Sequence, residues 1–427
     1  MIKKALWGLS TPQINYELLP VDLPQTERIP TPERITLLHA RKDSHSIPST
    51  LGIGDTVKTG EKLSLYPDQK DYVISPVTGR ISSLSPYTGD YAKSYIAITI
   101  RPDGNEIIDD TFQEQIQSPT LALVSEYLRG APGNPPLSLL AESNGPIQTI
   151  VIRGLDPDPA VATSQYIAQS RLRDLTKGIR ILKEITDVQD IILISAGESI
   201  QGYGHIGARI KSVKPVYPAA LSHMVMKDVL GQIVPAGKSC EDLGVCFFTA
   251  EAVISIGSAF ESGQIPTSKI LTFIQKNGSR KIVEVPIGTP IADILDAFGE
   301  TVNEFDRIIF GGLMTGSAVY SLEHPVQPDT DAVIVLDRDA AAYVSDYPCI
   351  NCGECVRICP AKMQVHMLVR YLEANQYENA ADSYDLYSCI ECGLCSYVCV
   401  SRIPIFQYIK LAKYELERTK TPEAADA

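Results

Sequence analysis

The sequence predicts an α+β chain of several domains, and three observations indicate this. Short apolar runs broken by Gly, Pro and Asp fill residues 35–105, which is typical of a small all-β unit. A strand, helix, strand pattern follows within residues 106–265, which favours a parallel sheet. Eight of the 10 cysteines lie between Cys349 and Cys399, so the C-terminal part forms a unit of its own. A chain of 427 residues is long enough for several cores.

We expect six segments along the chain. They are an extended, Pro-rich segment over 1–34, an all-β domain over 35–105, an α/β domain over 106–265, a β-grasp-like module over 266–330, a helical cysteine domain over 331–418 and a disordered tail over 419–427.

Local patterns place the elements of the middle segments. Apolar runs predict strands over 147–153 and 190–196, and helical spacing predicts a helix over 160–184 between them. Residues 269–310 read as short strands around an Asn277-Gly278 hairpin turn, with an amphipathic helix over 291–298. In the cysteine domain, apolar stripes predict helices over 363–374 and 405–416.

Composition excludes some classes of partner. With 38 Lys+Arg against 51 Asp+Glu the net charge is −13, which argues against nucleic acid or an anionic membrane surface as the main partner. The sequence shows neither the apolar core of a secretory signal nor the run of about 20 apolar residues that a transmembrane segment needs. We therefore expect a cytoplasmic protein that reaches a membrane only through partner subunits.

Two cysteine motifs lie forty residues apart. The first is Cys349-x2-Cys352-x2-Cys355-x3-Cys359, followed by Pro360, and the second is Cys389-x2-Cys392-x2-Cys395-x3-Cys399, followed by Val400. This is the spacing of ferredoxin-type 4Fe–4S binding, in which three thiolates of one loop reach three corners of a cubane. The two motifs therefore predict two 4Fe–4S clusters. In such pairs the fourth cysteine of each motif ligates the cluster held by the other motif. Cys349, Cys352, Cys355 and Cys399 would hold one, and Cys389, Cys392, Cys395 and Cys359 the other.

Zinc and disulfides are the alternatives for these cysteines. Zinc sites use two Cys-x2-Cys pairs or pairs mixed with His, and disulfide frameworks are typical of small secreted domains, so both fit the doubled motif less well. Val400 stands where many such motifs have Pro, which removes no ligand. Cys240 and Cys246 lie apart from the motifs and are expected to be core residues.

The all-β domain resembles the barrel-sandwich hybrid of biotinyl and lipoyl domains. The resemblance rests on Gly54-Asp-Thr-Val-Lys-Thr-Gly-Glu-Lys-Leu63 followed by Ser75-Pro-Val-Thr-Gly79. Such domains carry a modified Lys at a hairpin tip, and Lys70 is the candidate here. Its sequence context differs from the usual one, so a structural role for the domain is favoured over a swinging arm.

In its order of domains, the chain resembles the C subunit of Rnf electron-transport complexes. It is also similar to the A subunit of the sodium-translocating NADH:quinone reductase, which lacks the clusters. The matching segments are Gly54 to Gly79, Tyr217-Pro-Ala-Ala-Leu-Ser-His223, Gly288-Thr-Pro, Gly311-Gly-Leu-Met-Thr-Gly316 and the cysteine motifs. The resemblance implies a Rossmann-like α/β domain, an SLBB-like β-grasp module and a dicluster ferredoxin domain.

The same resemblance directs attention to a flavin and nucleotide site that this chain has altered. Rnf C subunits bind FMN and NADH with a loop Gly-x-Gly-Gly-Ala-Gly-Phe-Pro-Thr and an acidic Glu-x-Glu-Pro stretch. Here the loop is Leu128-Arg-Gly-Ala-Pro-Gly-Asn-Pro-Pro136, whose prolines remove backbone donors that a phosphate needs. The acidic stretch is replaced by Asp156-Pro-Asp-Pro159. We therefore expect FMN and NADH binding to be lost.

A Gly-x-Gly-x-x-Gly pattern occurs at Gly202-Tyr-Gly-His-Ile-Gly207. The acidic residue expected about 20 positions later is missing, so a structural turn is favoured over dinucleotide binding. His205 and His223 lie near this region, and we assign no catalytic role to either.

Together these patterns predict an iron–sulfur electron-transfer subunit with no independent catalytic site. It would pass single electrons between a soluble redox donor or acceptor and the membrane-embedded and peripheral subunits of an Rnf- or Nqr-like complex, on the inner face of the cell membrane. One alternative is a subunit that still oxidises NADH through FMN. Another is a structural adaptor in which the clusters only stabilise the fold.

Overall fold

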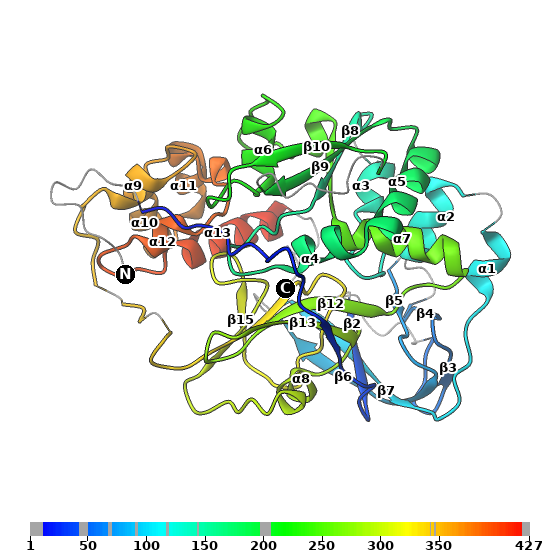
Figure 1. Cartoon of the computed structure of the whole chain (residues 1–427). Helices are drawn as coiled ribbons and strands as arrows, with labels where there is room; N and C mark the ends of the chain where they lie inside the picture. The colour runs from blue at the N-terminus through cyan, green and yellow to red at the C-terminus, as the bar shows by residue number, and fades with distance from the viewer. Residues whose placement is uncertain are drawn as a thin grey trace.

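The computed structural model describes residues 12–41, 50–66, 71–89, 93–116, 119–142, 145–196, 206–341, 343–345 and 347–420. The predicted α+β class is confirmed, since these residues form four sheets together with helices (Figure 1). Lys70, the segment Gly202 to His205 and residues 421–427 of the expected tail lie outside the described residues. Helix α13 runs to Lys420, two residues into that tail.

The N-terminal domain is all-β, drawn in blue in Figure 1. Its antiparallel sheet has the order β2-β7-β6-β3, and β4 pairs with β5. The strands are β2 (Ile35–Ala40), β3 (Thr56–Val57), β4 (Lys62–Leu63), β5 (Val73–Ile74), β6 (Gly79–Thr88) and β7 (Ser94–Pro102). Alternating side chains of β2, β6 and β7 are buried in one core because a half-exposed strand has a period of two residues. The barrel-sandwich assignment stays a prediction.

The α/β domain contains the parallel strands of the predicted βαβ unit, but two helices separated at Arg171 replace the single helix expected over 160–184. Its four strands are β8 (Thr149–Arg153), β9 (Asp190–Ala196), β10 (Arg209–Val213) and β11 (Val245–Thr249), in the order β10-β9-β8-β11 and all parallel. The helices are α1 (Thr111–Gln115), α2 (Leu121–Leu128), α3 (Leu137–Glu142), α4 (Thr163–Ser170), α5 (Leu172–Thr186), α6 (Ser222–Asp228) and α7 (Ala250–Ser262), with a short η2 (Glu241–Leu243).

The two faces of this parallel sheet have different neighbours. Ile150, Ile152 and Phe248 pack in one core with residues of α4, α5 and α7. Val151 and Phe247 point to the other face and share a core with residues of the cysteine domain. The sheet is thus covered on both sides, as parallel sheets are.

The third unit is a six-stranded mixed sheet with the order β1-β13-β12-β16-β14-β15. Its elements are β1 (Thr26–Arg28), β12 (Ser268–Ile274), β13 (Arg280–Pro286), α8 (Ile291–Ala297), β14 (Arg307–Phe310), β15 (Ser317–Val319) and β16 (Ala332–Leu336). The sheet therefore extends beyond the expected segment 266–330 on both sides, because β1 pairs with β13 and β16 pairs with β12 and β14. The β-grasp assignment stays a prediction.

The cysteine domain is helical. It contains α9 (Glu354–Ile358), α10 (Val365–Glu373), α11 (Tyr377–Tyr384), η3 (Leu386–Ser388), α12 (Leu394–Tyr397) and α13 (Ile405–Lys420). Helices α9 and α12 begin forty residues apart, and so do α10 and α13, so the repeat of the sequence is a repeat of structure. Within the described residues, no helix is long and apolar enough to cross a bilayer.

Candidate metal centres

Each cysteine motif forms a tight loop that leads into a short helix. In the first loop Asn351 and Gly353 have positive φ angles of 56° and 77°, and in the second Glu391 and Gly393 have 56° and 69°. Two left-handed residues in one loop curl the backbone, so that the three cysteines of a motif face a common centre. Gly353 and Gly393 then precede α9 and α12.

The structure brings the eight cysteines together in two sets of four. Cys349, Cys352, Cys355 and Cys399 line a small cavity, which we call the outer cavity. Cys389, Cys392, Cys395 and Cys359 line a second small cavity, the inner cavity. Each cavity thus combines three cysteines of one motif with the last cysteine of the other. This is the grouping that the sequence predicts for the ligands, although the ligand roles themselves stay predictions.

The chemistry of both cavities fits an iron–sulfur cluster. Four thiols surround each space, and apolar side chains such as Ile350 and Ile390 line most of the remainder. Thiolates are the soft ligands that such clusters use. Backbone N–H groups of Glu391 and Ile403 donate to the sulfurs of Cys389 and Cys399, each at 3.4 Å. Over the described ranges, no three His, Cys, Asp or Glu side chains meet closely enough to hold a single metal ion.

Burial affects the protonation of these thiols. Burial, together with neighbouring cysteines, raises the pKa of Cys355 to about 11 and that of Cys392 to about 12. A thiol must lose its proton to bind iron, so metal binding here would release protons.

The inner cavity lies against the α/β domain. Cys392 and Leu394 belong to the core that contains Tyr217, and the Tyr217 hydroxyl donates to the carbonyl oxygen of Cys392 at 2.5 Å. A Cβ atom on Gly393 would lie 2.4 Å from the carbonyl oxygen of Met314, so only glycine fits at this contact. In Figure 1 the helices of the cysteine domain, orange to red, lie beside β9, β10 and β15.

The outer cavity lies near the surface. Cys352 is exposed, whereas Cys392 at the equivalent place in the second motif is buried. Large apolar side chains nearby in the sequence are exposed as well, by 71% for Tyr347, 63% for Ile350 and 64% for Val400. The two cavities therefore differ in their access to solvent and to other proteins.

The loop expected to have lost flavin binding packs directly on α7. The Ser255 hydroxyl donates to the carbonyl of Pro132 at 2.8 Å, and the Gly133 N–H donates to the carbonyl of Pro328 at 2.8 Å. A Cβ atom on Gly133 would lie 2.2 Å from the backbone nitrogen of Ala252. Backbone of the loop thus occupies the space at the start of α7.

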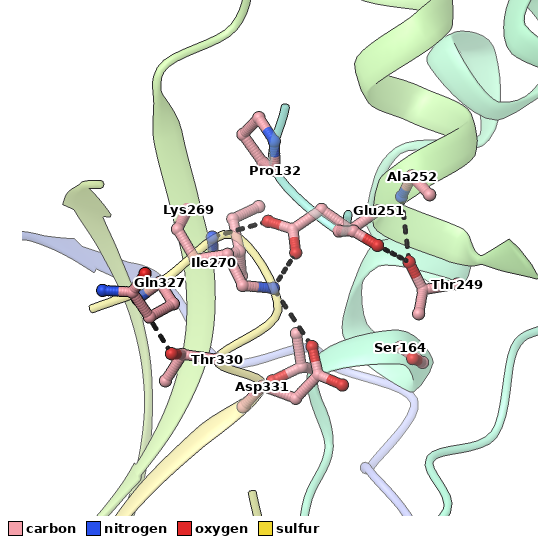
Figure 2. Close-up of polar contacts among 12 residues, drawn as sticks. Pro132, Ser164, Thr249, Glu251, Ala252, Lys269, Ile270, Gln327, Thr330 and Asp331 are labelled. Carbon is pink, nitrogen blue, oxygen red and sulfur yellow. Dashed lines mark hydrogen bonds and ion pairs between the residues drawn. The ribbon is translucent and has the colours of Figure 1, made fainter. Parts of the chain in front are cut away.

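A buried ion cluster lies next to this loop (Figure 2). The ammonium of Lys269, fully buried on β12, contacts the carboxylates of Glu251 on α7 and of Asp331, the latter at 3.0 Å. Glu251 also accepts the N–H of Ile270 at 2.7 Å. Burial lowers the pKa of Lys269, but the two carboxylates raise it by more, so the ammonium stays charged. The cluster ties α7 to the six-stranded sheet.

The two acidic residues of Asp156-Pro-Asp-Pro159 are also committed to internal contacts. Asp156 accepts N–H groups of Ser164 at 2.7 Å and Gln165 at 3.1 Å, at the start of α4. Asp158 accepts the N–H of Met314 at 2.7 Å. Both side chains are buried, with exposed fractions of 0% and 1%.

Three other residues considered from the sequence, Cys240, Cys246 and His223, lie outside the two cavities. Cys240 and Cys246 are buried, and burial raises their pKa values to about 11 and about 12, which suits neutral core thiols. His223 is half-buried, and burial together with Lys413 lowers its pKa. Sequence reasoning did not single out Tyr217 as a support of the inner cavity or His366 as a residue lining the outer one. A comparison of positions forty residues apart could have drawn attention to His366, because its counterpart is Phe406.

Comparisons with known proteins find a similar domain in the same part of the chain. Residues 348–403 match the family described as 4Fe-4S dicluster domain. The chain is 24% identical over 378 residues to the C subunit of the ion-translocating oxidoreductase complex of Buchnera aphidicola, covering 84% of this chain and 79% of that protein. It is 25% identical to the corresponding protein of Rhodobacter capsulatus, covering 72% and 63%, and 26% identical to that of Yersinia enterocolitica, covering 88% and 56%.

The chain is a relative of these C subunits. The predicted resemblance to C subunits is confirmed. The matches span between 56% and 79% of the length of these three relatives. Among solved structures, a chain of the NAD⁺-reducing [NiFe]-hydrogenase in the H2-reduced state is 13% identical, with a TM-score of 0.45 over 73% of this chain and 63% of that one. This similarity is too weak to place a site.

Proposed function

We propose that the chain is an iron–sulfur electron-transfer subunit of an ion-translocating oxidoreductase complex. The observation that carries the proposal is the pair of cavities, each lined by four cysteines in the crossed grouping of a two-cluster ferredoxin. The 4Fe-4S dicluster match and the similarity to C subunits support it. Each cluster, when bound, accepts and releases single electrons, while the protein supplies thiolate ligands, burial and position.

The difference in solvent exposure between the two cavities suggests where electrons enter and leave. The inner cavity is closed by Tyr217 of the α/β domain and by the loop between β14 and β15, where Met314 contacts Gly393, so it is the internal end of the path. The outer cavity has an exposed cysteine and exposed apolar side chains around it. We propose that a redox partner, soluble or a subunit of the complex, docks over the outer cavity. The chain itself would lie at the inner face of the cell membrane through its partner subunits.

Loss of FMN and NADH binding is the second part of the proposal. Three observations support it: the loop with Pro132 and Gly133 is packed on α7, the carboxylate of Glu251 is used by Lys269, and both aspartates near β8 are buried in internal hydrogen bonds. A phosphate would need free backbone donors at this loop. The chain would then receive electrons from a partner rather than from NADH.

Anaerobic purification followed by iron, sulfide and flavin analysis tests both parts. We expect about eight iron atoms per chain, from two cubane clusters, and no flavin. Electron paramagnetic resonance of the reduced protein should show two interacting clusters. Bound flavin with rapid NADH-dependent reduction of an artificial acceptor would contradict the loss of the nucleotide site. Zinc in place of iron would contradict electron transfer, and clusters that cannot be reduced and reoxidised reversibly would favour a structural adaptor.

A further inference from the structure

The linings of the two cavities largely match, but the outer cavity has two polar side chains besides its cysteines, His366 and Ser401. Residues that line one cavity correspond, forty positions apart, to residues that line the other, such as Ile350 with Ile390 and Val369 with Ile409. Most pairs match cysteine with cysteine, glycine with glycine or one apolar side chain with another. His366 in the outer cavity is different, because its counterpart in the inner cavity is Phe406.

His366 has a buried nitrogen that nothing in the described protein satisfies. Its Nδ1 atom is shielded from solvent and has no hydrogen-bond partner among the described residues. A buried polar atom without a partner costs about 1–3 kcal/mol, so native proteins rarely leave one unpaired. The side chain lines the outer cavity, where the sulfur atoms of a cluster would be the available acceptors.

Other polar groups at this cavity do not take the same role. Ser401 also lines it, but the Ser401 hydroxyl donates to the carbonyl oxygen of Pro348 at 3.3 Å. Arg370, on the same helix as His366, is exposed and donates to Asn351 at 3.0 Å. His366 is therefore the one lining side chain whose polar atom is buried and uncommitted within the described residues.

We infer that His366 donates a hydrogen bond to a sulfur atom of the outer cluster and so raises that cluster's reduction potential. The inference rests on the proposed function, since it requires a cluster in each cavity. A hydrogen bond to the sulfurs stabilises the extra negative charge of the reduced cluster, and such bonds help to set cluster potentials. Phe406 has no donor, so the inner cluster lacks this contribution. The protein thereby gives two clusters with the same ligands different potentials.

Redox titrations followed by electron paramagnetic resonance test the inference on the whole, cluster-loaded chain. In His366→Phe we expect one of the two potentials to fall, with the ratio of reduced to oxidised cluster at a fixed potential dropping about fivefold, the effect of one ordinary hydrogen bond. That ratio corresponds to about 40 mV for a one-electron couple. The reciprocal variant Phe406→His should raise the other potential.

His366→Asn is the matched control, because its amide nitrogen lies as many bonds from Cα as Nδ1 does. In this variant the potential of the outer cluster should stay close to the wild-type value. The inference is overturned if His366→Phe leaves both potentials unchanged, or if His366→Asn shifts the potential as much as His366→Phe does. Loss of the outer cluster in both variants also overturns it, since the role would then be structural. If the wild-type chain holds fewer than two clusters, the proposed function fails first and this inference with it.

Discussion

The hydroxyl of Tyr217, in the α/β domain, donates a hydrogen bond to the carbonyl oxygen of Cys392 in the second cysteine motif, at 2.5 Å. The two residues are 175 positions apart, and both are buried in the same core. This bond pairs a buried carbonyl oxygen of the curled cysteine loop with a side chain of another domain. It therefore joins the inner cavity to the sheet β10-β9-β8-β11.

Tyr217→Phe should loosen the inner cavity. The carbonyl of Cys392 would be left unpaired and buried, which costs about 1–3 kcal/mol. We expect faster loss of iron from one of the two clusters, measured as iron release to a chelator under anaerobic conditions. Tyr320→Phe is the control, because Tyr320 also donates to a backbone carbonyl, that of Thr88 at 2.8 Å, but outside the cysteine domain. Equal rates of release in the two variants would count against the role of Tyr217.

Cysteine substitutions test the crossed grouping. Cys355→Ala and Cys399→Ala should abolish the same paramagnetic signal, although the residues belong to different motifs, because both line the outer cavity. Cys359→Ala should abolish the other signal, since Cys359 lines the inner cavity. Iron should fall by about four atoms per chain in each variant. Cys240→Ala should retain all iron. If Cys355→Ala and Cys359→Ala abolish the same paramagnetic signal, each motif holds its own cluster.

Gly312→Ala should disturb the contact between the α/β domain, which contains Asp158, and the loop between β14 and β15 of the six-stranded sheet. A Cβ atom at Gly312 would lie 2.3 to 2.5 Å from atoms of the Asp158 side chain, which accepts the N–H of Met314. We expect about 1–3 kcal/mol of destabilisation from this overpacking and a lower thermal midpoint by circular dichroism. Gly104→Ala is the control, because a Cβ there would meet nothing within 4 Å. If both variants unfold at the same temperature, the close contact at Gly312 has no energetic role.

Glu251→Gln should destabilise the chain by about 3 kcal/mol, because the buried ammonium of Lys269 loses one of the two carboxylates that it contacts among the described residues. Thermal unfolding measures this change. Glu27→Gln removes the exposed pair with Lys281, whose side chains are 46% and 39% exposed, and should change the free energy of unfolding by less than about 1 kcal/mol. A joint Glu251→Leu, Lys269→Met variant should recover part of the lost stability, since the buried ammonium and the carboxylate of Glu251 are both removed while the Ile270 N–H loses its acceptor. Failure of that recovery would mean that the lost hydrogen bonds and the packing, not the buried ammonium, dominate here.

The pH dependence of stability should change in Asp156→Asn. Burial raises the pKa of Asp156 to about 7, so the folded chain holds a proton that the unfolded chain releases near its ordinary pKa of 3.8. Stability from this group is therefore present at low pH and is lost as pH rises towards 7, by at most about 1.4 kcal/mol per unit. We expect the thermal midpoint of the wild type relative to Asp156→Asn to fall between pH 4.5 and pH 7. Parallel profiles would contradict this.

The sequence by itself determined the parts of the protein that are local in the chain. The strand over 190–196 and the two cysteine loops follow from apolar periodicity and ligand spacing, which are properties of neighbouring residues. The grouping of Cys359 with Cys389 also follows, because a doubled motif at a fixed distance carries the geometry of its repeat. Similarity to C subunits likewise rests on motifs that the chain shows directly.

Only the tertiary structure decided how these parts meet. The apolar run Ala332–Leu336 carries no signal of the sheet it joins, and pairing with β12 and β14 assigns it to the six-stranded sheet. The burial of Asp156 and Asp158 depends on α4 and on the loop at Met314, which lie beyond their own segment. The two cavities differ in their surroundings because Tyr217 contacts the inner one and the buried nitrogen of His366 lies at the outer one. Such contacts join residues far apart in sequence, and local preference cannot encode which distant surfaces exclude water together.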